Sequence, residues 1–159
     1  DDRLVVFHDD TLERMCGVQG IIDDFTLAEP RALRLGKTEC VIPTFAEALE
    51  ALVRAGCRRV LTSGGRNTAQ EGIETLRALA AQATGRIEIM AGSGVNPSNA
   101  RLLAATGVDA LHFSARRERE GAMRFRNPQV SMGGCAGVPE YSVTDADETL
   151  VRKLLAKLE

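Results

Sequence analysis

Two histidines are the first candidates for chemistry in this sequence, His8 and His112. His8 ends the apolar run "LVVFH" at 4–8, and His112 lies within "VDALHFSA" at 108–115. A buried strand that ends in a polar residue delivers that side chain to its carboxyl end, where an imidazole can act as a general acid or base. A lone histidine at such a place is also commonly a hydrogen-bonded structural residue. If both strand faces point inward, His8 and His112 lie in one layer and are candidate catalytic groups.

Glycine-rich turns follow two further apolar runs, "RRVLTS" at 58–63 and "RIEIMAG" at 86–92. Glycines let backbone N–H groups approach a ligand closely, and a helix N-terminus that follows favours an anion. An alternative is that the glycines only permit tight turns, and "GSGVN" lacks the third glycine of a dinucleotide-binding motif. Convergence of the turns predicts a phosphate or carboxylate pocket formed by Ser63, Gly64, Gly65, Gly92, Ser93, Gly94, Asn96 and Ser114.

Sulfur-bearing side chains are candidate ligands for a soft metal ion. Met132 and Cys135 lie in "SMGGC", and Met15 and Cys16 are adjacent. A thioether and a thiolate together suit Cu(I). Each pair falls in a predicted loop and no spacing defines a metal site, so Met132 and Cys135 are the candidate copper ligands on residue type alone.

Helical periodicity separates the apolar runs. The sequence predicts helices over 44–55, after a Thr44 cap, and over 67–83 and 97–105. A final helix over 147–158 is predicted to bury one face, formed by Leu150, Leu154, Leu155 and Leu158. Strands that alternate with helices at roughly 25-residue spacing predict βα units and a parallel sheet.

The four apolar runs favour an α/β fold of TIM-barrel type that amounts to about half of a (β/α)8 barrel, because a closed barrel needs eight strands and roughly 200 or more residues. A single α/β domain is predicted over 1–159. An open four-stranded array has two bare edges. The sequence therefore predicts either a homodimer that completes a barrel-like ring or a flatter doubly wound sheet. Residues 121–146 are predicted as a loop, and "RRERE" at 116–120 as a solvated one.

Composition excludes several classes of function. The 159 residues are 44% apolar and 26% charged, and their net charge of −2 argues against a nucleic-acid-binding surface. No apolar run approaches the ~18 residues of a membrane span. Four cysteines without paired spacing indicate a reducing compartment, and we expect a cytoplasmic protein.

From about residue 50 to 159 the chain resembles the CutC family of copper homeostasis proteins, which have a (β/α)8-type barrel. The resemblance rests on "AGCRRVLTSGG", "AQEGIETLRAL", "RIEIMAGSGVNPSNARLLAATGVDALHFSA" and "VSMGG". The family usually shows glycine where this chain has Ser93. The resemblance implies a cytoplasmic protein linked to copper, with copper as a candidate bound ion, and it implies no defined catalytic mechanism.

Residues 1–49 resemble glycerophosphodiester phosphodiesterases through "LVVFHDDTLERMCGVQGIIDDFTLAEPRAL" and "IPTFAEAL". In that family the histidine at the position of His8 acts in hydrolysis beside a divalent metal ion. Met15 and Cys16 replace the usual threonines, and residues 1–49 hold no counterpart of the second histidine or of the metal-binding carboxylates.

Three hypotheses remain. The chain is a copper-homeostasis protein that binds copper or an anion at the strand ends, a phosphodiesterase remnant without activity, or a recombined barrel fragment. Enzymatic activity is the less favoured alternative.

Overall fold

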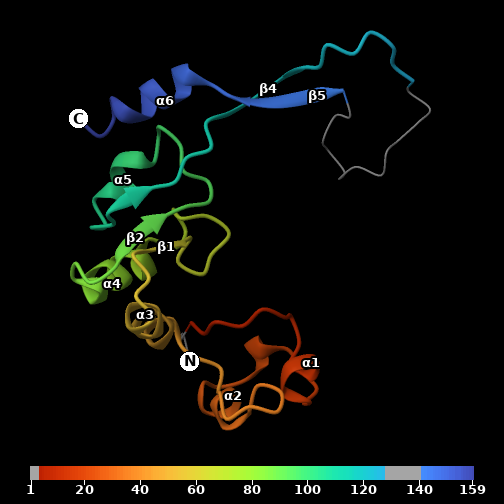
Figure 1. The fold of residues 1–159 in the computed structure, drawn as a ribbon, viewed down its shortest axis with the longest axis vertical. Coiled ribbons are helices and arrows are strands. Elements are labelled where there is room, and N and C mark those ends of the chain that lie inside the picture. The colour runs from red at the N-terminus through yellow and green to blue at the C-terminus, as the bar shows by residue number, and fades with distance from the viewer. Residues whose placement is uncertain (1–3, 128–140) are drawn as a thin grey trace.

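The computed structural model describes residues 4–127 and 141–159, and Figure 1 shows their arrangement. In chain order the elements are α1 (Glu13–Cys16), the 3-10 helix η1 (Ile22–Asp24), α2 (Ala28–Ala32), α3 (Phe45–Arg54), β1 (Arg59–Thr62), α4 (Ile73–Ala83), β2 (Glu88–Ala91), α5 (Ala100–Ala104), β3 (Ala110–Leu111), β4 (Arg116–Glu120), β5 (Ser142–Ala146) and α6 (Glu148–Leu155).

A parallel sheet in the order β1-β2-β3 confirms the prediction of an α/β fold with parallel strands. The strands are in close register, since the N–H of Gly92 donates to Thr62 O at 3.0 Å and that of His112 to Ala91 O at 2.8 Å. Central strand β2 buries Ile89 and Ala91 completely. The carboxyl ends of all three strands therefore lie at one edge of the sheet.

The first apolar run does not form the predicted fourth strand of this sheet. Val5 forms an isolated antiparallel bridge with Thr44, the N–H of Val6 donates to Pro43 O at 2.8 Å, and the N–H of Phe45 donates to Leu4 O at 3.1 Å. The backbone of 4–6 is thus paired with the segment that leads into α3. The predicted four-stranded parallel array is wrong for the described residues, which contribute three parallel strands.

Helix α3 begins as the sequence predicts, at the Thr44 cap. The N–H of Glu47 donates to Thr44 Oγ1 at 3.3 Å, and the Glu47 carboxylate accepts from the Thr44 N–H at 2.9 Å, which completes a capping box. The Arg31 guanidinium, and after it the Thr44 N–H, lowers the pKa of Glu47 to about 2. This ion pair ties α2 to the start of α3.

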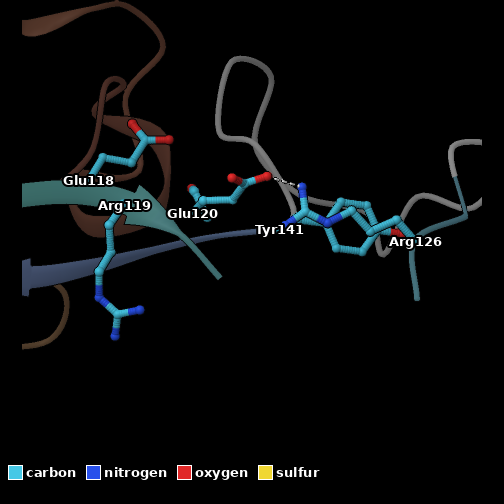
Figure 2. Close-up of a pocket in the computed structure, with 6 residues that line it drawn as sticks. Glu118, Arg119, Glu120, Arg126 and Tyr141 are labelled. Atoms are coloured by element: carbon cyan, nitrogen blue, oxygen red, sulfur yellow. Dashed lines mark hydrogen bonds and ion pairs between the residues drawn. The ribbon is translucent and has the colours of Figure 1, made fainter. Parts of the chain in front are cut away.

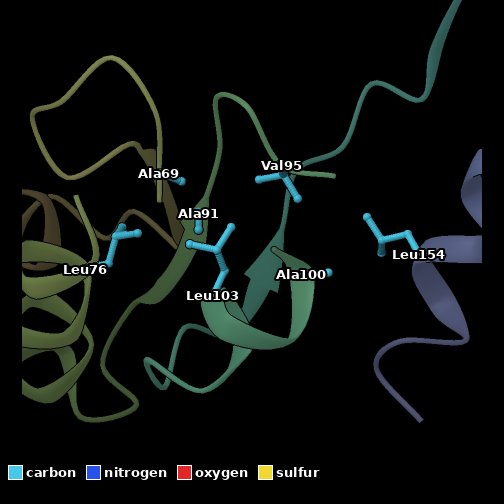
Figure 3. Packing of buried hydrophobic residues seen from close by; sticks show 7 residues of the cluster. All are labelled: Ala69, Leu76, Ala91, Val95, Ala100, Leu103 and Leu154. Carbon is cyan, nitrogen blue, oxygen red and sulfur yellow. The ribbon is translucent and has the colours of Figure 1, made fainter. Parts of the chain in front are cut away.

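The hydrophobic core lies between α4, the sheet, α5 and α6 (Figure 3). Figure 3 shows Leu76 of α4 and Leu103 of α5 directed toward Ala91 of β2, while Leu154 reaches the same cluster from α6. Leu76 and Leu103 are completely buried. A second cluster joins α3 and α4 to the same face of the sheet through Leu49, Leu79 and Ile89, since Ile89 and Ala91 are alternate residues of β2.

Helices α4 and α5 are shorter than predicted. Residues 68–71 form a turn closed by Thr68 and Glu71, in which each side chain bonds to the backbone N–H of the other, so regular helix starts at Ile73. Residues 96–99 form a similar side-chain-bonded turn before Ala100.

The C-terminal part differs from prediction in two ways. Residues 116–120 and 142–146, both predicted as loop, form β4 and β5, which pair antiparallel, although all five side chains of β4 are exposed. Figure 1 shows this ribbon extending away from the parallel sheet. In α6 only Leu154 of the four predicted leucines is buried, whereas Leu155 and Leu158 are exposed. Within the predicted loop at 121–146, residues 128–140 lie outside the described residues.

Across 4–127 and 141–159, no helix combines the length and the apolar composition that a bilayer-crossing segment needs.

Candidate functional site

The glycine-rich turns meet at the carboxyl edge of the sheet, as the sequence predicts. Ser63, Gly64 and Gly65 follow β1, and Gly92 follows β2 next to His112, since a Cβ built on Gly92 would lie 3.4 Å from the His112 Cβ. This edge is the usual place for ligands in parallel α/β proteins. The turns after β1 and β2 are therefore neighbours at one edge.

The turn after β1 depends on close backbone contact. Gly64 and Gly65 have φ values of +76° and +73°, a region that strongly favours glycine. A Cβ on Gly72 would lie 1.9 Å from Ser63 O, so the start of α4 packs directly against this turn. The Ser63 Oγ donates to Arg66 O at 2.5 Å and closes the loop. These contacts hold residues 63–67 in one shape.

An open depression of about 800 Å³ lies at this loop, lined by Ser63, Gly65, Arg66, Asn67 and Glu71. Among the described residues, the Arg66 guanidinium has no ion-pair partner, and the N–H groups of Gly65, Arg66 and Asn67 donate to no described residue. One carboxylate, that of Glu71, shares the depression. The depression thus offers several unused donors and one opposing charge.

The turn after β2 uses most of its polar groups internally. Asn96 Oδ1 accepts from the N–H of Ser98 at 2.9 Å, and Asn96 Nδ2 donates to Gly94 O at 3.0 Å. The buried side chain of Asn99 donates from Nδ2 to Gly94 O and accepts from the Asn96 N–H at Oδ1. The side chain of Asn96 is thereby occupied in shaping the turn.

Ser93 occupies a conformation that suits glycine. Its φ is +74°, and its Oγ donates to Asn67 O at 2.6 Å, which links the two turns. The left-handed region costs a residue with a Cβ about 1 kcal/mol. This geometry explains why glycine fits the position.

Replacement of Ser93 separates these two effects. Ser93→Ala removes the hydroxyl bond and keeps the strain, whereas Ser93→Gly removes both. We expect the glycine variant to be more stable than the alanine variant by about 1 kcal/mol in urea unfolding. Equal stability of the two variants would show that the left-handed conformation at this position carries no cost.

The two histidines do not share one site. His112 and Ser114 are exposed, just beyond β3. His8 precedes α1, and its side chain is 92% exposed. Figure 1 shows α1 and α2 on the far side of α3 from the sheet. The predicted layer containing both imidazoles is absent, because residues 4–6 pair with the segment before α3 and not with the sheet.

His8 has one polar neighbour in the described structure. Its Nδ1 lies 2.8 Å from Asp9 Oδ1, and Arg14 donates to both oxygens of that carboxylate at 2.6 and 2.7 Å. The Arg14 guanidinium, together with His8, lowers the pKa of Asp9 to about 2. Asp9 is therefore ionised throughout the physiological range, and its main partner is Arg14.

The predicted copper ligands Met132 and Cys135 lie outside the described residues. Within 4–127 and 141–159, no three His, Cys, Asp or Glu side chains group in a way that could hold a metal ion. Cys16 is a free, half-buried thiol in α1, and burial raises its pKa. The described donor set therefore does not by itself fit a copper site.

A second depression, of about 520 Å³, lies on the β4–β5 ribbon (Figure 2). Figure 2 shows the Arg126 guanidinium against the Tyr141 ring, 5.3 Å from its centre, and bonded to Glu120. Arg119 pairs with Asp145. The arginines at this depression are thus already paired, in contrast to Arg66.

Sequence reasoning missed Arg66, Asn67 and Glu71. The available signal was the basic residue directly after the two glycines in "SGGRNTAQE". A polar loop residue gives no periodic pattern, so only the folded turn shows that Arg66 borders the depression.

Comparison with known proteins identifies the family of this chain. The sequence profile of the CutC family matches residues 23–117, which begins inside the segment that resembles phosphodiesterases. A family protein CutC of Bacteroides thetaiotaomicron is 46% identical over 107 residues, which cover 65% of this chain and 43% of that protein. The copper homeostasis protein cutC homolog of Homo sapiens is 44% identical over 110 residues, which cover 69% and 40%. The chain thus spans less than half the length of these relatives.

Two solved structures are also similar. The protein named CutC from Streptococcus agalactiae is 36% identical, with a TM-score of 0.40 over 42% of this chain and 33% of that one. A glycerophosphoryl diester phosphodiesterase from Parabacteroides distasonis is 16% identical, with a TM-score of 0.28 over 69% and 66%. Neither score is high enough to support an argument about the fold. The profile match over more than half of the sequence does decide the family: this chain belongs to the CutC family.

Proposed function

We propose that this CutC-family chain binds a small oxyanion, such as phosphate or a carboxylate, at the carboxyl edge of its parallel sheet. The observation that carries the proposal is the depression at 63–67, where the Arg66 guanidinium has no described partner beside three unused backbone N–H groups. Consecutive N–H groups in a turn with left-handed residues form concavities that bind anions.

The charge at the depression is balanced. Arg66 supplies one positive charge and Glu71 one negative charge, and Glu71 Oε2 also accepts from the Thr68 N–H at 3.2 Å. An anion must therefore be held by the arginine and the N–H groups together against one carboxylate. We therefore expect the anion to bind weakly, with an affinity that depends strongly on these two charges.

Removal of Arg66 tests this arrangement. A charge-assisted hydrogen bond contributes about 1.5 kcal/mol or more, so we expect Arg66→Ala to weaken phosphate binding by about tenfold. Isothermal titration with inorganic phosphate measures the change. Arg77→Ala is the matched control, because Arg77 lies on α4 and pairs with Glu74 at 2.7 Å.

Glu71→Gln is expected to change the affinity for phosphate in the opposite direction. It removes the opposing charge and keeps an oxygen for the Thr68 N–H, so phosphate binding should tighten. If Arg66→Ala and Arg77→Ala bind phosphate equally, or if Glu71→Gln weakens binding, the depression is not the anion site.

Copper is the second ligand that we propose, because relatives of this chain are named copper homeostasis proteins. The candidate soft ligands remain Met132 and Cys135, on residue type alone, and both lie outside the described residues. We expect Cys135→Ser to lose stoichiometric Cu(I) in equilibrium dialysis against a competing chelator under reducing conditions. Cys57→Ser serves as the control, and equal uptake by both variants would remove Cys135 from the proposal.

The cellular role follows from the two ligands. We place the chain in copper homeostasis in the cytoplasm, as a ligand-binding protein and not as a hydrolase. His8 does not carry a hydrolytic role in this proposal, since its described polar neighbour is a carboxylate already held by Arg14.

A further inference from the structure

An apolar groove lies next to the depression at 63–67. It has a volume of about 230 Å³ and is lined by Val6 and by residues of α3, β1 and α4, among them Phe45 and Leu61. Val6 is 45% exposed and Leu61 is 54% exposed, so the groove is open to solvent. Its volume is several times the ~30 Å³ that a water molecule occupies in the liquid. The groove therefore has room for a short hydrocarbon tail.

The groove and the depression adjoin each other. Thr62 lines the groove, and the next residue, Ser63, lines the depression. Gly65 also lines the depression, and a Cβ built on it would lie 3.2 Å from Cζ of Phe45, which lines the groove. The Phe45 ring thus packs against the turn that carries the unused N–H groups. A single small ligand can therefore extend from one cavity into the other.

The two cavities differ in chemistry. The depression offers Arg66 and backbone donors, whereas the described residues that line the groove carry no charge. Thr62 has the one polar side chain among them, and its Oγ1 already accepts from the Gly64 N–H at 3.0 Å. Binding sites for small molecules commonly combine an apolar wall with a few polar groups that fix the orientation. Inorganic phosphate would fill the polar part alone.

We propose that the oxyanion bound at the depression is organic and carries a short hydrocarbon tail, which lies in the groove beside Val6 and Leu61. This inference rests on the proposed anion site and adds the class of ligand, a phosphate monoester or carboxylate whose remaining part is apolar. Arg66 and the N–H groups of 65–67 hold its head. Transfer of the tail from water into the groove supplies binding energy that offsets the opposing carboxylate of Glu71.

Methyl phosphate and butyl phosphate test the inference, because they share one head group and differ by three methylene groups. Each fully buried methylene tightens binding about fourfold. Since the groove is open to solvent, we expect butyl phosphate to bind about tenfold more tightly than methyl phosphate in isothermal titration of the full protein. Arg66→Ala should weaken the binding of both esters.

Leu61→Asn isolates the contribution of the groove. It puts an amide in the apolar wall, so we expect the preference for butyl phosphate to fall to about threefold or less. Leu155→Asn is the matched control and should keep the preference, since Leu155 is 53% exposed on α6 and lines neither cavity. If Leu61→Asn does not fold, nuclear magnetic resonance of the wild type replaces it. The methyl signals of Val6 and Leu61 should then shift with butyl phosphate and not with methyl phosphate.

The possible failures are distinguishable. Equal affinity of the wild type for both esters overturns the inference and leaves the anion site in place. A preference that Leu61→Asn keeps as fully as Leu155→Asn, or unshifted methyl signals of Val6 and Leu61, puts the tail elsewhere and also overturns it. Butyl phosphate binding that Arg66→Ala does not change overturns the joint site. Failure of the wild type to bind either ester overturns the proposed anion site and this inference together.

Discussion

Gly72→Ala is expected to lower the free energy of unfolding by about 3 kcal/mol and to abolish measurable phosphate binding. The added Cβ would lie 1.9 Å from Ser63 O and 3.0 Å from the Gly64 Cα, and neither backbone can move without opening the turn. The φ of Gly72 is −89°, which alanine adopts freely, so the effect comes from space alone. Urea unfolding and phosphate titration measure the two losses.

Gly85→Ala provides the control. Gly85 has a φ of +72° and nothing within 4 Å of an added Cβ, so this change introduces backbone strain without a clash. We expect a cost of about 1 kcal/mol and unchanged phosphate binding. If Gly72→Ala is no less stable than Gly85→Ala, the close packing of α4 against the turn is not a feature of the folded protein.

Leu76→Ala is expected to destabilise the protein by about 3 kcal/mol, because it leaves a cavity in the centre of the main core. Leu76 is completely buried between α4 and the sheet, beside Ala91 and Leu103. Loss of this contact loosens α4, whose start supports the turn at 63–67. Thermal or urea unfolding followed by circular dichroism gives the change in stability.

Leu102→Ala is the matched substitution on the surface. Leu102 is 48% exposed on α5, and its truncation should cost less than about 1 kcal/mol. Similar losses for both leucine variants would mean that α4 does not pack on the sheet as described.

The sequence predicted elements whose signals are local. Helix α3 begins directly after Thr44, because this cap and Glu47 lie within one turn of each other. Strands β1 and β2 are short apolar runs between helices, and the structure pairs them in parallel. The run at 4–8 has the same composition, yet its pairing partner is the segment at 43–45. Composition predicts an extended segment but does not choose its neighbour.

Long-range packing explains the other differences. The periodicity of α6 predicts four inward leucines, but only Leu154 packs into the core, and Leu155 is exposed. Residues 116–120 carry no apolar pattern and form β4 only because β5 pairs with them. These outcomes depend on partners distant in the sequence.

The candidate site was predictable in part. The glycines at 64 and 65 show a turn at the end of β1, and the structure adds the reason, which is the approach of Gly72. His8 and His112 do not lie together as predicted, because the prediction required residues 4–6 to pair with the parallel sheet and they pair with 43–45. Arg66 could be identified only after the loop was folded.

A nuclear magnetic resonance titration of the isotope-labelled chain with inorganic phosphate tests the anion site most directly. We predict saturable shifts of the backbone N–H signals of Gly65, Arg66 and Asn67, with no shift at Gly85, and loss of these shifts in Arg66→Ala. Saturable shifts confined to other parts of the chain, or the same titration curve in Arg66→Ala as in the wild type, would contradict the assignment of the site.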